Sequence, residues 1–127
     1  MDKEKRELVD HPAHYNRGNI EAIEVIEDWK LYFSVGSAVK YIARLGAKDL
    51  EMQELEKTKW YLKRVISNKI GADVSVGEKY TVDEVIKDWG LNKFLGMVLR
   101  FIYHQEFKTA ILALDMEIER RKKGWLK

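Results

Sequence analysis

The sequence predicts an all-α protein with two three-helix units, about six helices in all, packed around a pseudo-two-fold axis. Two observations predict this class. Apolar residues recur at helical spacing along most of the chain, and almost no stretch alternates as a strand would. A shift of 60 positions also places much of the second half on the first. Because self-similarity at a fixed spacing sets an architecture, we expect both units to share one fold.

The internal repeat is clearest around two tryptophans. Residues 24–31, EVIEDWKL, correspond to residues 84–91, EVIKDWGL. A gap in a later turn brings residues 60–66 opposite residues 112–118. Two such units would bury each other's apolar faces, much as the subunits of an isologous dimer do.

The first unit spans residues 11–69 and follows a charged arm, residues 1–10. It opens with the HPAHY loop, because a residue that precedes proline is disfavoured in a helix. We expect its helices at about residues 20–29, 34–45 and 49–69, with Asn19 and Ser34 as the first two N-caps. Their inward stripes are predicted as Ile23, Ile26 and Trp29; Val35, Ala38, Val39, Ile42 and Leu45; and Leu55, Leu62, Val65 and Ile66.

Residues 70–80 contain two glycines and no helical period, and we interpret them as a linker. The second, degenerate unit is residues 81–127. It begins with Thr81 and Glu84, which have the spacing of a capping box. Its helices are expected at about residues 82–89, 93–105 and 107–123.

Composition excludes several classes of function. The 23 basic and 21 acidic residues leave a net charge of +2, which argues against nucleic acid as a partner. The lack of cysteine excludes disulfides and thiolate metal sites and fits a reducing cytoplasm. No apolar run approaches the length of a membrane-spanning helix, so we expect a cytoplasmic protein without a membrane partner.

Polar residues differ between the units more than scaffold residues do. The substitutions across the repeat are Glu21 to Thr81, Tyr41 to Phe101 and Arg44 to His104. The HPAHY loop has no counterpart before the second unit. We therefore interpret the first unit as the active half and the second as a supporting half.

One set of motifs resembles a known family. The motifs are HPAHY, then Gly18-x-Ile20-Glu21, then Gly36-x-x-x-Lys40-Tyr41-Ile42-x-Arg44-x-Gly46-x-Lys48, then a helix around Lys59-Trp60-Tyr61-Leu62. Over about residues 9–68 the chain resembles an SaV-like family of tailed-phage proteins of unknown function, often labelled phage nucleotide kinase. The resemblance implies a phage or prophage source and an activity on nucleotides. One better-studied member is described as a nucleoside-monophosphate kinase without the standard kinase motifs.

Neither the P-loop signature nor a Rossmann glycine motif is present in the sequence. A phosphate cradle would therefore have to be built from side chains. Lys40, Arg44 and Lys48 could supply it, with Arg17 from the loop, because phosphoryl transfer needs positioning and charge neutralisation. The alternative is an ordinary solvated basic face. Tyr41 completes this candidate ligand-binding cluster.

The loop offers candidates of other kinds. His11 and His14 could ligate a metal, cap helix ends or hydrogen-bond a ligand, and His14 is our candidate general base. Tyr15 could stack on a base or pack the loop onto the core. Glu21 is the candidate catalytic carboxylate and Mg²⁺ ligand, because its carboxylate is not repeated in the second unit. Glu24 and Asp28 recur as Glu84 and Asp88, which indicates structural roles such as capping or pairing.

Three functions remain open. The first is a phosphotransferase of nucleotide metabolism that would use Mg²⁺ and ATP. The second is a nucleotide-binding protein without turnover, for instance one that sequesters a host signal, and it needs no cofactor. The third is a helical interaction module. We expect a small-molecule nucleotide as the partner in the first two, and self-association into a homo-oligomer stays open in all three.

Overall fold

A computed structural model describes residues 18–45, 51–69 and 71–125 of the chain. Within these ranges the protein is all-α, as predicted, and contains no strand. Its helices are α2 (Ala22–Asp28), α3 (Phe33–Arg44), α4 (Glu51–Asn68), α5 (Val82–Asp88), α6 (Lys93–Tyr103) and α7 (Phe107–Trp125). None of the described helices is both long and apolar enough to cross a bilayer.

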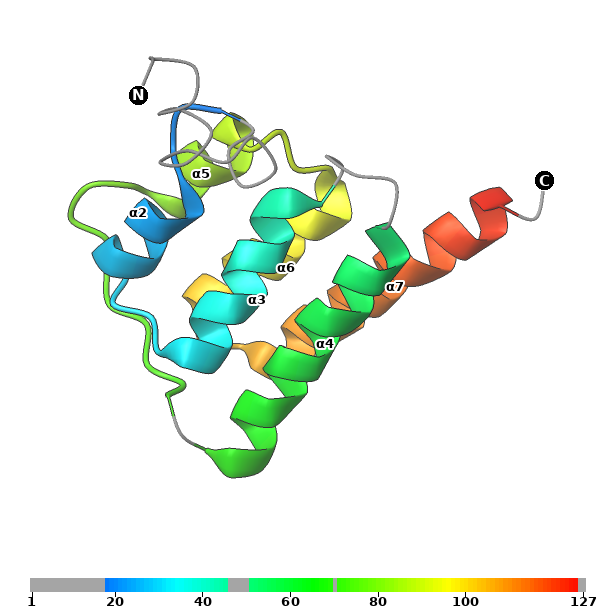
Figure 1. Ribbon diagram of the computed structural model, residues 1–127, viewed down its shortest axis with the longest axis horizontal. Helices are drawn as coiled ribbons and strands as arrows, with labels where there is room; N and C mark the ends of the chain where they lie inside the picture. The colour runs from blue at the N-terminus through cyan, green and yellow to red at the C-terminus, as the bar shows by residue number, and fades with distance from the viewer. Residues whose placement is uncertain (1–17, 46–50, 70, 126–127) are drawn as a thin grey trace, which may run out of the picture.

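Four helices form the body of the molecule. Helix α3 packs on α4, α6 packs on α7, and the α4–α7 and α3–α6 contacts join these two pairs. The short helices α2 and α5 lie together at one end (Figure 1). Buried residues from all six helices form one hydrophobic cluster. The two halves of the chain therefore share a core, while the exact domain boundaries stay a prediction.

Each half of the molecule holds the segment that leads into the other half. The indole of Trp29 donates to the carbonyl of Tyr80 at 3.2 Å, and the indole of Trp89 donates to the carbonyl of Ile20 at 2.7 Å. Tyr80 and Ile20 are themselves 60 residues apart, as are the two tryptophans. The contact is thus reciprocal, as a pseudo-two-fold axis would require. The duplication itself stays a prediction.

Two aspartates complete this reciprocal contact. Carboxylate oxygens of Asp28 accept hydrogen bonds from the backbone N–H groups of residues 78–80, at 2.9–3.1 Å. Those of Asp88 accept from the N–H groups of Asn19 and Ile20, at 3.0 and 2.8 Å. These four side chains, Asp28, Trp29, Asp88 and Trp89, are called the reciprocal clasp below. The structural role predicted for the two aspartates is confirmed.

Close helix packing within each half is also repeated. A Cβ atom placed on Gly36 would lie 3.4 Å from Ile26, and one placed on Gly96 would lie 3.3 Å from Ile86. The small residue lets α3 approach α2, and α6 approach α5, at the same position. Each three-helix unit therefore brings its first two helices together in the same way.

Several local predictions are confirmed. Trp29 and Trp89 lie in the core, and every residue of the stripe predicted on α3 is fully buried. The Thr81 hydroxyl accepts a hydrogen bond from the Glu84 N–H at 3.1 Å, so it caps α5 as expected. The Glu84 carboxylate bonds that hydroxyl rather than the Thr81 N–H.

Other predictions at the helix starts were wrong. Helix α2 begins after Glu21, whose backbone is extended, and not after Asn19, because Asp88 holds the N–H groups of Asn19 and Ile20. Helix α3 has Tyr32 as its N-cap residue, and Ser34 lies inside the helix. Ile23, predicted to point inward, is 55% exposed. The inward face of α2 instead carries Ala22, Val25 and Trp29. The expected stop at Gly46 lies outside the described residues.

We predict that Asp28→Ala lowers the free energy of unfolding by about 1–2 kcal/mol at pH 7, because it removes a charged acceptor from three backbone N–H groups. Burial acts to raise the pKa of Asp28, but the N–H groups of Tyr80, Lys79 and Glu78 outweigh it and hold this pKa below its usual value. The carboxylate therefore contributes its full stability above the unfolded pKa of about 3.9. That contribution is lost as pH falls through the lower folded pKa.

Urea unfolding of the wild type and the variant at neutral and acidic pH measures this effect. The difference between them should shrink in acid. Glu27→Ala, a change at the exposed neighbouring carboxylate, is the control and should alter stability by no more than about 0.5 kcal/mol. A difference for Asp28→Ala that stays constant down to pH 2 would contradict the proposed role of its charge.

Candidate functional site

The structure describes four of the nine residues that the sequence analysis assigned to a site. His11, His14, Tyr15, Arg17 and Lys48 lie outside the described residues. Of the other four, Lys40, Tyr41 and Arg44 lie together on α3, whereas Glu21 precedes α2. The lysine, tyrosine and arginine predicted to form one cluster therefore do share a helix, while their roles stay predictions.

Tyr41 is the centre of the contacts around this cluster. Its ring stacks on that of Tyr61 from α4, with the centroids 5.9 Å apart and the planes at 22°. The ammonium of Lys57 lies 5.5 Å from the Tyr41 centroid, and the guanidinium carbon of Arg44 lies 5.9 Å from it. Cations at such distances from an aromatic face are attracted by the ring quadrupole. The predicted α3 cluster is thus completed by side chains of α4.

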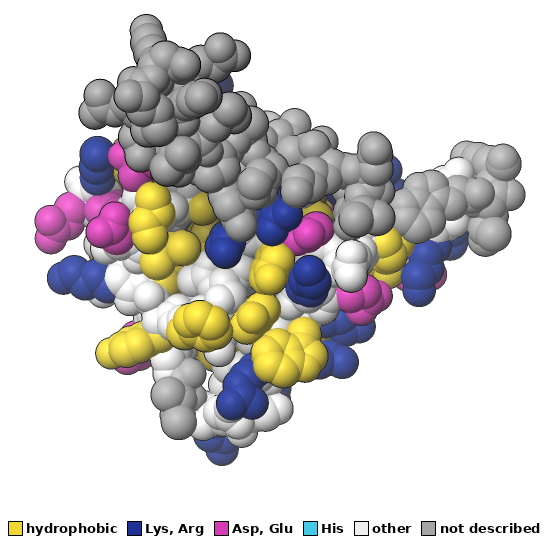
Figure 2. Space-filling view, viewed as in Figure 1, with side chains coloured by type: hydrophobic (Ala, Val, Ile, Leu, Met, Phe, Trp, Pro, Cys, Tyr) yellow, Lys and Arg dark blue, Asp and Glu magenta, His cyan; other side chains and the backbone are white. Residues whose placement is uncertain are grey.

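Further aromatic rings extend this cluster into one surface. Phe33 and Trp60 both meet Tyr61 edge to face, at centroid distances of 6.1 and 5.0 Å. The guanidinium carbon of Arg64 lies 5.8 Å from the Trp60 centroid. Figure 2 shows hydrophobic side chains interspersed with Lys and Arg over α3 and α4. We call this the aromatic–cationic surface; it consists of Phe33, Tyr41, Lys57, Trp60, Tyr61 and Arg64.

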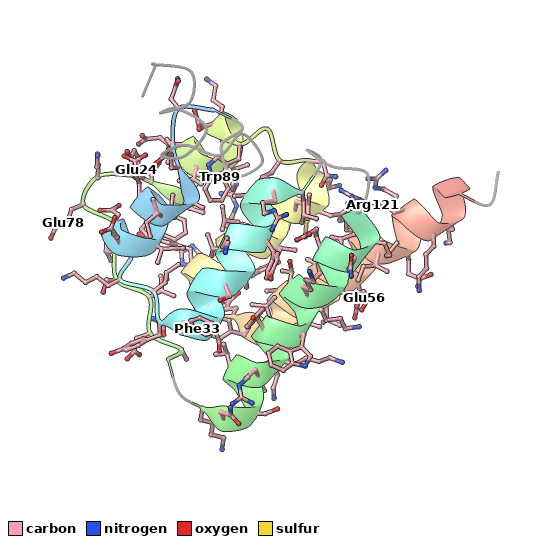
Figure 3. The ribbon with its side chains drawn as sticks, viewed as in Figure 1. Glu24, Phe33, Glu56, Glu78, Trp89 and Arg121 are labelled. Atoms are coloured by element: carbon pink, nitrogen blue, oxygen red, sulfur yellow. The ribbon has the colours of Figure 1, made fainter. Side chains whose placement is uncertain are left out.

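The rings of this surface differ in how much they are covered. Tyr41 and Tyr61 are half-buried, whereas Phe33 is 79% exposed and Trp60 is 57% exposed. Phe33 stands at the first turn of α3 (Figure 3). Large aromatic side chains that stay open beside cations are the groups that nucleotide bases stack on. The sequence analysis named Trp60 only within a helix of the family motif and gave Phe33 no role.

The spacing of three residues on α4 is the sequence signal that could have revealed this surface. Lys57, Tyr61 and Arg64 stand at i, i+4 and i+7, which places them on one face of the helix. Neither Lys57 nor Arg64 makes an ion pair with another described residue. Their charges are therefore available to a ligand.

Arg44 has a second, structural contact beneath this surface. Its guanidinium lies 3.6 Å from the carboxylate of Glu54, and the two side chains are only 14% and 8% exposed. The other carboxylate oxygen of Glu54 is buried without a hydrogen-bond partner. The Arg44 charge therefore compensates a buried carboxylate, a role that the sequence did not reveal.

Glu21 and its neighbours are engaged in helix capping. The Glu21 N–H donates to the Glu24 carboxylate at 2.9 Å, in a capping box at the start of α2. Glu24 also accepts from the Tyr80 hydroxyl at 3.2 Å and pairs with Lys79 at 3.5 Å. Across the described part of the chain, no three His, Cys, Asp or Glu side chains are placed to hold a metal ion together. The role of Glu21 as an Mg²⁺ ligand stays a prediction, and we derive no step through a metal.

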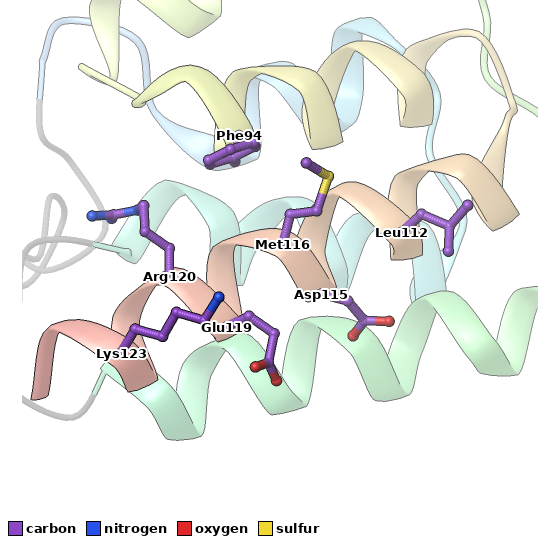
Figure 4. A pocket seen from close by; sticks show the side chains of 7 residues that line it. All are labelled: Phe94, Leu112, Asp115, Met116, Glu119, Arg120 and Lys123. Atoms are coloured by element: carbon purple, nitrogen blue, oxygen red, sulfur yellow. The ribbon is translucent and has the colours of Figure 1, made fainter. Parts of the chain in front are cut away.

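The corresponding face of the second half has a different chemistry. Arg100, in the place of Lys40, pairs with Asp83 at 2.6 Å. Leu112 and Met116 stand in the places of Trp60 and Arg64 and are 64% and 50% exposed. They line a hollow of about 620 Å³ between α6 and α7 (Figure 4). The hollow is lined by Phe94, Leu112, Asp115, Met116, Glu119, Arg120 and Lys123.

A fully buried carboxylate, Glu117 on α7, forms a separate polar cluster. It accepts hydrogen bonds from Asn92, Arg120 and Arg121 at 2.5–3.3 Å. Burial acts to raise the Glu117 pKa, but these donors outweigh it and lower that pKa. Asn92 also caps α6 by accepting from the Leu95 N–H at 2.9 Å. We therefore assign this cluster to the anchoring of α6 on α7.

Comparison with known proteins gives little functional information. A family described as a protein of unknown function (DUF3310) matches residues 9–63, which include α2, α3 and most of α4. No curated protein matches the chain. No solved structure matches it either. The matched stretch carries most of the aromatic–cationic surface, whereas the second half of the chain lies beyond it.

We predict that Arg44→Ala lowers the free energy of unfolding by about 3 kcal/mol, because it leaves the buried Glu54 carboxylate uncompensated. The double variant Arg44→Met with Glu54→Leu should recover most of this loss, since apolar side chains of similar volume can replace a buried pair. Urea unfolding compares the two. Equal losses in the single and double variants would show that the pair does not carry the effect.

Proposed function

We propose that the protein binds a nucleotide on the aromatic–cationic surface. The observation that carries this proposal is the contiguous set of rings, two of them open, with Lys57 and Arg64 lying over ring faces. Stacking on an aromatic side chain contributes about 1–3 kcal/mol per base, whatever the base. Lysine and arginine supply charge-assisted hydrogen bonds to phosphate.

The aromatic and the cationic side chains of this surface would bind different parts of the nucleotide. The exposed faces of Phe33 and Trp60 would take the base, because the rings of Tyr41 and Tyr61 already cover each other. Lys57 and Arg64, on the same face of α4, would take the phosphate. The half-buried tyrosines would hold the open rings in place by edge-to-face contacts. An anionic ligand with a planar group satisfies both halves of this surface.

Turnover is a separate proposal that rests on the family resemblance. Phosphoryl transfer from ATP to a nucleoside monophosphate would need His14, Glu21 and Mg²⁺ in the roles predicted above. The capping contacts of the Glu21–Glu24 pair do not support a metal site there. Binding without turnover is therefore what the described residues support best. A phage source and a host-cytoplasmic location likewise stay predictions of the resemblance.

The interaction-module hypothesis has one observation in its favour. Exposed tryptophan, tyrosine and arginine side chains also dominate the energetic centres of protein interfaces. Such centres are enclosed by a rim that excludes water, whereas this surface carries two cations, Lys57 and Arg64, that make no ion pair with another described residue. A cationic environment suits an anionic ligand better than an apolar protein surface.

We predict that nucleotides quench the fluorescence of Trp60. Trp29 and Trp89 are buried and should respond little. With Trp125, the fourth tryptophan, replaced by Phe in both proteins compared, Trp60→Phe should remove most of the signal while retaining a ring for stacking. Calorimetric titration with AMP, ADP, ATP and cyclic AMP measures affinity independently of fluorescence. The double variant Lys57→Ala with Arg64→Ala removes both proposed phosphate-binding cations and should bind the preferred nucleotide about tenfold more weakly, which corresponds to ~1.4 kcal/mol.

The pseudo-equivalent change, Thr109→Ala with Met116→Ala, is the control and should leave affinity unchanged. Equal losses from both double variants would contradict a site confined to the first half. No binding of any of the four nucleotides by the wild type would reject the proposal. The same titrations with Mg²⁺, a nucleoside monophosphate and ATP, followed by product analysis, test phosphoryl transfer.

A further inference from the structure

The two open rings of the aromatic–cationic surface, Phe33 and Trp60, both contact one half-buried ring, Tyr61. Phe33 comes from α3 and Trp60 from α4, and each contacts the edge or face of Tyr61. The planes of Phe33 and Trp60 are turned by 73° and 88° from that of Tyr61. They therefore offer two separate stacking faces. The distance between the Phe33 and Trp60 centroids cannot exceed the sum of their two centroid distances to Tyr61. A single base occupies one such face and leaves the other exposed to water.

Cations lie over two rings of this surface. Arg64 lies over Trp60, and Lys57 lies over Tyr41 on the side of α4 that faces α3. Along α4 the two cations stand one turn before and one turn after Tyr61. A phosphodiester that links two stacked bases would pass between them. Glu56, the exposed carboxylate beside Lys57 in sequence, lies on the flank of α4 turned away from α3 (Figure 3).

From this arrangement we infer that the surface takes a ligand with two bases joined by a phosphodiester, either a free linear dinucleotide or a segment of a single strand. The inference rests on the proposed nucleotide binding and names its ligand class. The net charge of +2 favours a short ligand, because affinity for a long strand grows with the number of phosphates that a protein neutralises. The open exposure of both rings also suits a ligand that lies across a surface.

The second half of the molecule supplies matched controls for this inference. At the positions 60 or 52 residues further along the chain, Lys93 replaces Phe33, Leu112 replaces Trp60 and Met116 replaces Arg64. Neither stacking ring has a counterpart there. Leu112 is 64% exposed, as open as the rings it is compared with, so Leu112→Ala removes a side chain of similar exposure without touching the proposed site.

The test compares three probes by calorimetric titration of the full chain: AMP, the linear dinucleotide diadenylate, and an eight-residue oligoadenylate. We expect diadenylate to bind at least tenfold more tightly than AMP. Phe33→Ala should weaken the binding of diadenylate at least tenfold. It should weaken the binding of AMP no more than about twofold, because AMP can still stack on Trp60. Trp60→Ala should behave in the same way, and Leu112→Ala should change nothing. Both ring side chains are mostly exposed, and unchanged melting temperatures will show that the variants fold.

Each outcome has a defined meaning. An octamer that binds as well as diadenylate identifies a strand segment as the ligand, and a much weaker octamer identifies the free dinucleotide; both support the inference. Equal affinities for AMP and diadenylate overturn it while the proposed nucleotide binding survives. Affinity that continues to rise steeply with strand length also overturns it, in favour of backbone binding. Failure of all three probes rejects the proposed function itself.

Discussion

The reciprocal clasp is the constraint on which the rest of the structure depends. Each aspartate holds backbone N–H groups, and each tryptophan a carbonyl, of the segment that leads into the other half. Gly77 fits beside it only because it has no Cβ, which would lie 2.4 Å from the carbonyl of Tyr80. Since Trp29 and Trp89 are almost completely buried, these polar groups must be satisfied by one another. Each half therefore fixes the backbone that leads into the first helix of the other half.

This constraint separates the scaffold of the molecule from its surface chemistry. The burial pattern of residues 83–102 repeats that of residues 23–42 almost position by position, so the buried faces of the two halves are under the same packing demands. The outward faces of α4 and α7 are free of those demands. One carries aromatic rings and cations, and the other carries Leu112 and Met116 above a hollow. The difference between the halves therefore lies where a ligand can reach it.

Features set by residues close together in sequence were predicted correctly, whereas features set by residues far apart in sequence were not. The α3 stripe was predicted correctly because helical burial is visible in local periodicity. The predicted start of α2 was wrong because Asn19 and Ile20 are held by Asp88, 69 and 68 positions away in sequence. The chain turns after α5 at Gly90, which has a positive φ, and a glycine in the sequence is a signal for such a turn. The equivalent turn after α2 uses Lys30, also with a positive φ, and a lysine gives no such signal. The Arg44–Glu54 contact was not predicted because Glu54 comes from another helix, and the ligand-binding role of Arg44 stays a prediction.

A nearly neutral chain can still present a cationic site, because its charges are not distributed evenly among partners. Arg44 is matched by Glu54, Lys59 by Asp115 and Arg100 by Asp83, so these cations add little to the outward field. Lys57 and Arg64 have no such acidic partner among the described residues and lie instead over aromatic rings. A ring quadrupole attracts a cation without neutralising its charge. The field of this surface is thus short in range and is felt by a ligand that stacks on the rings, not by a distant polyanion.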